Sequence, residues 1–204
     1  MATPRHKPDY YSRRARQESF ASRAVYKLAD IDRKFQLFKP GQCVLDLGCA
    51  PGSWLQYISS RIGPQGLVVG LDRQALRISS NPSIHFVQVD VAALDPGSLT
   101  RFSASFDVVV SDLAPSTSGI KDVDHQRSLG LARLSWEYAN RLLTAAGHYL
   151  VKVFQGPDFP PFAQEIKQHF QQVDILKPSG SRSESRELYL LGRRRLKESG
   201  AGIG

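Results

Sequence analysis

Residues 43–54 read CVLDLGCAPGSW, and this stretch decides the fold class because it joins a short apolar run to a glycine-rich turn. The first five residues are typical of a buried strand, and a helical pattern begins at Ser53. Glycines at 48 and 52 allow backbone conformations that larger residues do not. The glycine spacing is neither GxGxxG nor GxxxxGK followed by Ser or Thr, so the usual signatures of dinucleotide binding and nucleotide hydrolysis are missing. A simple tight turn is the alternative interpretation of this spacing taken alone.

The same alternation of apolar runs and helical patterns continues outward along the chain. Helical spacing of apolar residues, interrupted by breakers such as Pro40-Gly41, predicts helices at 19–39, 53–62, 124–145 and 159–169. Short apolar runs predict strands at 43–47, 67–71, 84–89, 106–111, 148–154, 173–176 and 187–191. Strands that alternate with helices form βαβ units. The predicted fold class is therefore α/β, with a mostly parallel sheet and helices on both faces.

The length of 204 residues suits one domain. We expect a basic N-terminal arm at 1–18, a single domain at 19–193 and a flexible C-terminal tail at 194–204. A mitochondrial transit peptide is the alternative for the Arg-rich arm, but Asp9, Glu18 and the prolines argue against it. No run approaches the roughly 18 apolar residues of a membrane span. We therefore expect no membrane partner and a cytoplasmic protein.

The formal net charge of +8 lies entirely at the two ends of the chain. Residues 1–39 carry a net +6 and residues 177–204 a net +4, whereas the residues between them carry −2. Basic ends around a near-neutral middle indicate a polyanionic partner held by the edges of the domain. Solvated basic tails are the alternative explanation of the charge alone.

The two cysteines and five histidines do not predict a metal site. Cys43 and Cys49 are six residues apart, with no CxxC pattern and no paired histidines at zinc-ligand spacing. We expect two reduced thiols and no bound metal.

Acidic residues follow three of the predicted strands. Asp72, Asp90 and Asp112 come directly after the second, third and fourth strands of the chain. In open α/β sheets, ligands bind beyond the carboxyl ends of the strands, and an acid after the second strand can bond the ribose hydroxyls of an adenosine-containing ligand. Each Asp alone is most often a helix cap, but three successive strand ends favour a ligand site.

Five segments together resemble the FtsJ-type 2′-O-ribose RNA methyltransferases, most closely the short bacterial branch that methylates a uridine of 23S, large-subunit ribosomal RNA. They occur in family order over about residues 20–192 and read SRAVYKL (22–28), DLGCAPGSW (46–54), SDLAP (111–115), LVKVFQG (150–156) and SRELY (185–189). The resemblance implies the class I methyltransferase fold, a Rossmann-like seven-stranded sheet whose last strand is antiparallel, and S-adenosylmethionine as the cofactor.

The family's motifs also imply the site residues. The catalytic tetrad falls on Lys27, Asp112, Lys152 and Glu187. The methyl donor is expected to contact Gly48, Pro51, Gly52, Trp54, Asp72, Asp90 and Asp112, with Gly48 and Pro51 shaping the turn. The family commonly has glycine where this chain has Ser53, a residue type that also caps helices well.

Lys152 interrupts the apolar run Tyr149–Phe154, where a lysine is costly without partners. This position argues against an ordinary surface ion pair. Two mechanisms stay open for it. Lys152 either acts as a neutral general base, or it stays charged, orients the 2′-oxygen and stabilises negative charge.

The basic ends are the expected RNA contacts. The RNA-binding candidates are Arg13, Arg14, Arg16, Arg23, Arg182 and Arg186, with Arg5, Lys7 and Lys177 as further phosphate partners and Tyr10 or Tyr11 as a stacking platform.

The resemblance makes ribosomal RNA within the 50S subunit or its late precursor the expected partner of a monomeric enzyme. The alternatives are methylation of a tRNA anticodon loop and a non-catalytic ribosome-assembly module that binds RNA. An oxidoreductase does not fit the glycine spacing.

Overall fold

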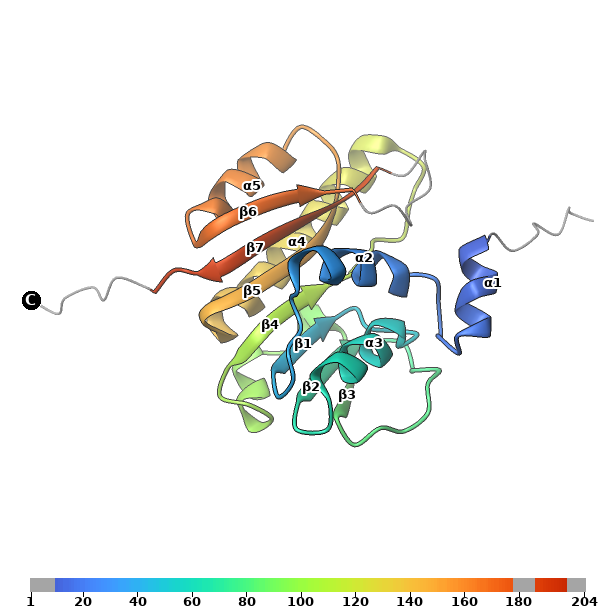
Figure 1. The fold of residues 1–204 in the computed structure, drawn as a ribbon. Coiled ribbons are helices and arrows are strands. Elements are labelled where there is room, and N and C mark those ends of the chain that lie inside the picture. The colour runs from blue at the N-terminus through green and yellow to red at the C-terminus, as the bar shows by residue number, and fades with distance from the viewer. Residues whose placement is uncertain (1–9, 178–185, 198–204) are drawn as a thin grey trace, which may run out of the picture.

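The computed structural model describes residues 10–177 and 186–197, and these residues form one sheet of seven strands (Figure 1). The strands are β1 (Cys43–Leu47), β2 (Leu67–Asp72), β3 (Ile84–Gln88), β4 (Phe106–Ser111), β5 (Leu143–Phe154), β6 (Phe170–Leu176) and β7 (Glu187–Arg195). Their order in the sheet is β3-β2-β1-β4-β5-β7-β6. Only β7 runs antiparallel to its neighbours, β5 and β6. The predicted seven-stranded, mostly parallel sheet with a last antiparallel strand is confirmed.

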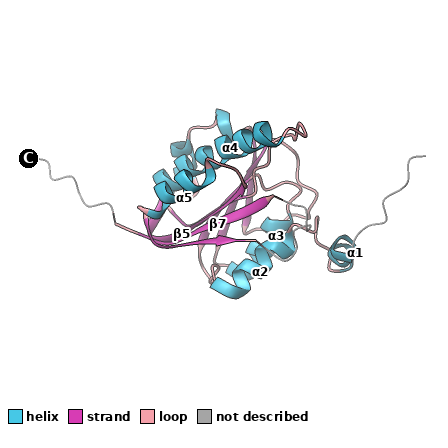
Figure 2. Cartoon of the chain, turned by 90° about the horizontal axis from the view of Figure 1, so that it is seen from above, coloured by secondary structure: helices cyan, strands magenta, loops and turns pink. Residues whose placement is uncertain are grey.

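Helices cover both faces of this sheet, as Figure 2 shows from above. The α-helices are α1 (Tyr10–Gln17), α2 (Val25–Phe35), α3 (Ser53–Ile62), α4 (Lys121–Leu142) and α5 (Phe159–Lys167). Two short 3₁₀ helices, η1 (Val91–Ala93) and η2 (Pro96–Arg101), lie between β3 and β4. Helices α4 and α5 pack on one face, and α2 and α3 pack on the other (Figure 2).

The side-chain alternation of the central strand builds one core on each face. Leu45 and Leu47 of β1 are fully buried in the cluster that contains α4 and α5. Val44 is fully buried in the cluster that contains α2 and α3. Because both faces are covered, the strands read as nearly continuous apolar runs, which is why their positions could be predicted well.

Helix α2 is shorter than the sequence predicts, since it begins at Val25 rather than at residue 19. Residues 19–24 are irregular, and the side chain of Gln56 supplies part of their hydrogen bonding. Its amide oxygen accepts from the Ala21 N–H, and its nitrogen donates to the Ser19 carbonyl. A side chain of α3 thus replaces the helical bonds that the periodicity suggested.

The junction between α4 and β5 also differs from the prediction. The helix ends at Leu142 rather than 145, and β5 begins at Leu143 rather than 148. The buried guanidinium of Arg195 donates from one nitrogen to the carbonyls of Ala139 and Leu143, at the end of the helix. A cation that satisfies terminal carbonyls stabilises a helix end. Strand β7 continues to Arg195, past the predicted strand end at 191.

The described part of the predicted arm is helical. Helix α1 buries Ala15 in a small cluster with Val25 and Tyr26, and Tyr11 packs beside the Tyr26 ring at 5.6 Å between ring centroids. Residues 1–9 of the predicted arm and 198–204 of the predicted tail lie outside the described residues.

Asp32 fastens α2 to α3 from inside the protein. Its side chain is 1% exposed and accepts hydrogen bonds from the Tyr57 hydroxyl at 2.8 Å, the Arg61 Nε at 3.1 Å and the Phe38 N–H at 3.1 Å. Three donors offset the cost of burying the Asp32 carboxylate. Removing that carboxylate leaves all three donors without their acceptor.

We predict that Asp32→Ala lowers the free energy of unfolding by about 2–4 kcal/mol, because it leaves the Tyr57 hydroxyl and the Phe38 N–H without their acceptor. Urea denaturation monitored by circular dichroism measures this change. The matched control is Asp30→Ala in the same helix, whose partner Arg33 is exposed, with an expected cost below about 1 kcal/mol. Equal losses in the two variants would contradict the role of Asp32.

Candidate active site

The ammonium group of Lys152, in the interior of β5, is the centre of the candidate site. The side chain is only 5% exposed. Its Nζ donates to the backbone oxygen of Asp112 at 2.7 Å and forms an ion pair with Asp112 Oδ1 at 2.9 Å. The same Oδ1 accepts a hydrogen bond from the Tyr189 hydroxyl at 2.8 Å. Asp112 thus compensates the charge of a lysine that would otherwise be costly in a core strand.

Lys27 and Glu187 form a second ion pair, with 2.5 Å between Nζ and Oε2. Lys27 comes from α2, which packs over the sheet, and Glu187 is the first residue of β7. The antiparallel register pairs Lys152 with Tyr189, two residues from Glu187 on the same face of β7. The structure therefore gathers the four predicted catalytic residues at one end of neighbouring strands, in two pairs.

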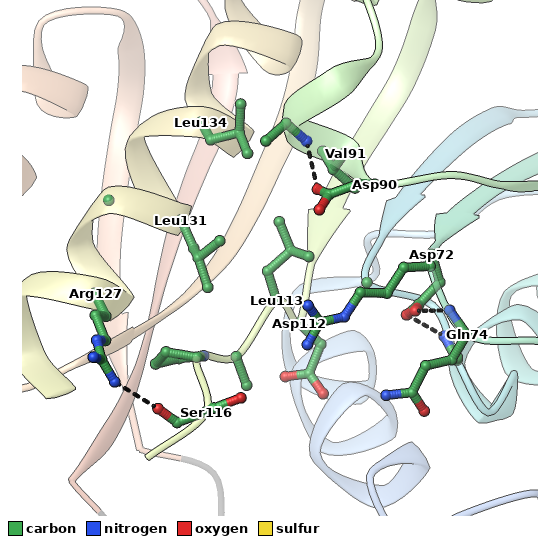
Figure 3. Close-up of a pocket in the computed structure, with 17 residues that line it drawn as sticks. Asp72, Gln74, Asp90, Val91, Asp112, Leu113, Ser116, Arg127, Leu131 and Leu134 are labelled. Atoms are coloured by element: carbon green, nitrogen blue, oxygen red, sulfur yellow. Dashed lines mark hydrogen bonds between the residues drawn. The ribbon is translucent and has the colours of Figure 1, made fainter. Parts of the chain in front are cut away.

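A cavity of about 560 Å³ lies beside this cluster, at the carboxyl ends of β1, β2 and β4 (Figure 3). Its lining includes four residues predicted to contact the cofactor, namely Gly48, Asp72, Asp90 and Asp112. The cavity continues along α4, where Leu131 and Leu134 supply an apolar wall. Its size and its mixture of carboxylates and apolar side chains suit a small polar ligand with an aromatic part.

The carboxylates of the cavity keep free acceptor capacity for such a ligand. Asp72 accepts from the N–H groups of Ala50 and Gln74, one bond on each oxygen. Asp90 caps η1 by accepting from the Ala92 N–H. Each carboxylate oxygen has two lone pairs, so ribose hydroxyls or an amino group can still bind there. Asp90 is therefore a helix cap, which was the alternative to a ligand contact when each Asp was considered alone. It also lines the cavity.

Gly48 is required by the turn that follows β1. Its φ angle is +81°, and a Cβ atom there would lie 2.9 Å from the backbone nitrogen of Leu113. The Asp112 N–H donates to the Leu47 carbonyl, which holds the ends of β1 and β4 together. The absence of a side chain at 48 thus brings the turn against the strand end that carries Asp112.

Three residues predicted to contact the cofactor do not line this cavity. Trp54 is 2% exposed and donates from its indole to the Ala24 carbonyl, so its ring packs in the core under α2. Gly52 precedes α3 and packs against Ile78. Pro51 lines a smaller neighbouring hollow.

Asp46, in the middle of the apolar run CVLDL of β1, is a candidate residue that the sequence analysis missed. It is completely buried, and within the described residues neither carboxyl oxygen has a hydrogen-bond partner. Burial raises the pKa of this carboxyl well above its ordinary value, and the charges of Asp112 and Asp72 raise it further. The sequence contains the same pattern that drew attention to Lys152, since Asp46 is also a charged residue inside an apolar run.

The first turns of α4 fix the loop that follows Asp112. The Asp124 carboxylate accepts hydrogen bonds from the Ser118 N–H, the Ser118 hydroxyl and the Gly119 N–H. The bond from the Ser118 amide is the main cause of the lowered pKa of Asp124. No pattern in the sequence indicates this contact, because it depends on how the loop folds back.

The next residue of α4 fixes the loop that follows Lys152. His125 is buried, with 2.9 Å between its Nδ1 and the Phe154 carbonyl, and its Nε2 accepts from the Asp158 N–H. A Cβ atom at Gly156 would lie 2.3 Å from the imidazole ring. The glycine of the LVKVFQG segment therefore gives room to His125, whose role is to hold this loop.

Helix α1 presents the arginines expected to bind RNA. Arg13 and Arg16 are exposed, whereas Arg14 pairs with Glu18 and lies over the ring of Tyr26 at 4.8 Å. These side chains put positive charge on a helix that packs against α2 through a small apolar cluster, next to a hydrogen bond from the Tyr26 hydroxyl to Glu18.

The arginines near the other end of the chain are placed differently. Arg186 donates to the carbonyls of Lys121 and Gln155, so it also ties β7 to the loops beside the site. Arg23 is half-buried. Arg182 lies outside the described residues.

No group of three or more potential metal-ligating side chains lies together in residues 10–177 and 186–197. No helix in these ranges is long and apolar enough to cross a membrane.

Comparison with known proteins gives consistent relatives. The model of the FtsJ-like methyltransferase family matches residues 20–195. A ribosomal RNA large subunit methyltransferase E from Bdellovibrio bacteriovorus is 42% identical over 90% of this chain and 95% of its own length. The protein of the same name from Coxiella burnetii is 44% identical over 91% of this chain and 90% of its own length.

A solved structure supports the fold assignment. A crystal structure assigned to a ribosomal RNA methyltransferase from Plasmodium falciparum superposes with a TM-score of 0.77 at 28% identity, over 87% of this chain and 99% of that one.

We predict that the amide hydrogens of Ser118 and Gly119 stay protected from exchange at about pH 4 and lose protection at lower pH. A carboxyl whose folded-state pKa is lowered, like that of Asp124, stabilises the fold above its unfolded pKa of about 3.9. That contribution disappears as the pH falls through the lower, folded-state value. Hydrogen exchange followed by mass spectrometry measures it.

Asp124→Ala should remove this protection at every pH, while Asp122→Ala, an exposed neighbour on the same turn, should leave it intact. Slow exchange of both amides in Asp124→Ala would show that the carboxylate does not hold the loop.

Proposed function

The chain belongs to the FtsJ-like methyltransferase family, whose methyl donor is S-adenosylmethionine, and from that membership we propose that it methylates the 2′-hydroxyl of a uridine in 23S ribosomal RNA. The observation that carries the proposal is the buried Lys152–Asp112 pair at the edge of the cavity. Relatives more than 40% identical over nearly the whole chain are named for large-subunit ribosomal RNA.

The cavity residues fit the donor. Asp72 would bind its ribose hydroxyls and Asp90 the edge of its base, because both carboxylates line the cavity and keep free lone pairs. Gly48 leaves room for the donor beside the turn, and Asp112 borders both the cavity and Lys152. When bound, S-adenosylmethionine supplies a methyl group on a positively charged sulfur.

Lys152 would hold the acceptor oxygen. Methyl transfer from a sulfonium is an in-line displacement, so catalysis depends mainly on placing the ribose oxygen, and positioning alone can contribute about 7–11 kcal/mol. An ammonium group has three N–H donors, and Lys152 directs two interactions at Asp112. Within the described residues the third N–H has no acceptor, so it could bind the ribose 2′-oxygen. This geometry favours the charged, orienting role over the neutral-base role.

The other members of the cluster would set the position of Lys152 and of the substrate. Tyr189 donates its hydroxyl to the same Asp112 oxygen that pairs with Lys152. The Lys27–Glu187 pair lies at the start of β7, where the ribose would enter next to Lys152. A network in which each partner is bonded has fewer rotamers, which favours a single reactive arrangement.

The basic surface of α1 would contact the phosphates around the target. Phosphate contacts supply most sequence-independent affinity for RNA. We propose the 50S subunit or its late precursor as the substrate. We also propose that the active enzyme is a monomer and that it works in the cytoplasm. A tRNA substrate and a non-catalytic assembly role are the competing outcomes of the assay below.

We predict that Lys152→Ala lowers methyl transfer by about 10²–10³-fold, because the acceptor oxygen loses a positioned donor, while the affinity for S-adenosylmethionine stays nearly unchanged. Purified protein, labelled donor and either unmethylated 50S particles or total tRNA would be incubated, and the modified nucleoside mapped. Lys152→Met guards against a packing defect, and Lys167→Ala, exposed at the end of α5, is the matched control.

Each other outcome of that assay has a definite meaning. Label on a base instead of a ribose contradicts the role of the tetrad. Label only on tRNA changes the substrate, and donor binding without any transfer favours the assembly module. Loss of donor affinity together with transfer would make Lys152 a structural residue.

We also predict that replacing Arg13, Arg14 and Arg16 together with Ala weakens RNA binding and reduces the slope of log affinity against log salt by up to about 2, since three phosphate contacts are lost. Filter binding over a salt series measures the slope. Arg101→Ala, at an exposed arginine that ends η2, is the control. An unchanged slope in the triple variant would remove α1 from the RNA contact surface.

A further inference from the structure

Asp46 lies at the centre of the sheet, directly beneath the candidate site. It is on β1, between β2 and β4, and pairs in register with Gly70 and Val110. Two residues further on, the same strand reaches Gly48, which lines the cavity. Because side chains alternate along a strand, Asp46 shares its face with Val44, in the core formed with α2 and α3. Leu150 and Tyr189, from the strands of the lysine site, belong to the same core.

The surroundings of Asp46 contain carboxylates but no compensating donor. The side chain is completely buried, and both of its oxygens are without a hydrogen-bond partner in the described part of the chain. The charges that act on it come from Asp112, after β4, and Asp72, at the end of β2. Two further titratable groups lie nearby in the described part of the chain, the buried thiol of Cys49 and the buried hydroxyl of Tyr189, and burial raises the pKa of both.

The nearby cations are already paired. Lys152 is bonded to Asp112, and Lys27 to Glu187. An ionised carboxylate at 46 would therefore add a third negative charge to the cluster of Asp72 and Asp112, in a place from which water is excluded. An unpaired buried carboxylate is so costly that the group takes up a proton instead. The free protein accordingly holds Asp46 as a neutral carboxylic acid.

A cationic ligand in the cavity would reverse this balance. S-adenosylmethionine carries a positive sulfonium and a positive α-ammonium group, whereas the product left after methyl transfer has a neutral sulfur. The cavity is bordered by the same two carboxylates that act on Asp46. A positive charge placed among them favours the ionised form of every acid nearby.

We propose that Asp46 couples binding of the positively charged methyl donor to the release of one proton. The O–H bond of the carboxylic acid breaks, its proton passes to solvent, and the carboxylate that remains stabilises the cation in the cavity. After transfer the sulfur is neutral, so Asp46 regains a proton from solvent and holds the product less tightly than the donor. This inference rests on the proposed function, because it takes S-adenosylmethionine as the ligand.

Calorimetry tests the coupling without any turnover. Binding of S-adenosylmethionine would be titrated in two buffers of different ionisation enthalpy between about pH 5.5 and 7, below the α-amino titration near 8. The wild-type protein is expected to release up to about one proton, and its affinity to rise by up to about tenfold per pH unit over this window. S-adenosylhomocysteine, with its neutral sulfur, should release fewer protons.

Asp46→Asn keeps the shape of the side chain but cannot ionise, so its binding should release no proton and lose the pH dependence. The control is Asp90→Asn, an exposed carboxylate of the same cavity, which is expected to weaken binding but to leave the proton count unchanged. Heat signals of the wild type that do not depend on the buffer overturn the inference, even if Asp46→Asn does not fold.

Equal proton release by wild type and Asp46→Asn would assign the proton to another group and also overturn the inference. Neither result would touch the proposed function, which fails instead if the wild-type protein binds no S-adenosylmethionine or transfers no methyl group.

Discussion

The pairing of Lys152 with Asp112 is the interaction on which the rest of the site depends. An ammonium group in the middle of a core strand is tolerated only where an acceptor takes its hydrogen bonds, and Asp112 provides both a carbonyl and a carboxylate oxygen. Tyr189 fixes that carboxylate from a third strand. The sheet order β4-β5-β7 is therefore a requirement of the chemistry, because it makes these three residues neighbours.

The start of α4 keeps this arrangement rigid from the opposite side of the sheet. Asp124 holds the loop after β4, and His125 holds the loop after β5. These loops follow Asp112 and Lys152 directly, so one helix terminus fixes both halves of the central pair. Loops that are anchored by buried groups can present reactive side chains in one geometry, as positioning catalysis requires.

The central strands and the unusual position of Lys152 could be read from the sequence for the same reason. Core strands are apolar on both faces, so the charge of Lys152 inside Tyr149–Phe154 stands out. Contacts between segments that are far apart in the sequence could not be predicted from it. The Gln56 bonds that replace the first turns of α2, and the Arg195 bonds that end α4, join residues far apart in sequence. Asp46, like Lys152, is a charged residue inside an apolar run. That its carboxyl oxygens have no hydrogen-bond partner among the described residues could be seen only in the structure.

The central claim is that Lys152 holds the ribose oxygen that receives the methyl group. A crystal structure of the protein with S-adenosylhomocysteine and a short hairpin of the target RNA measures this directly. In that structure Lys152 Nζ is expected to lie about 2.7–3.2 Å from one ribose 2′-oxygen while it stays bonded to Asp112. An RNA bound with no ribose oxygen within reach of Lys152, or with a base presented there instead, would contradict it.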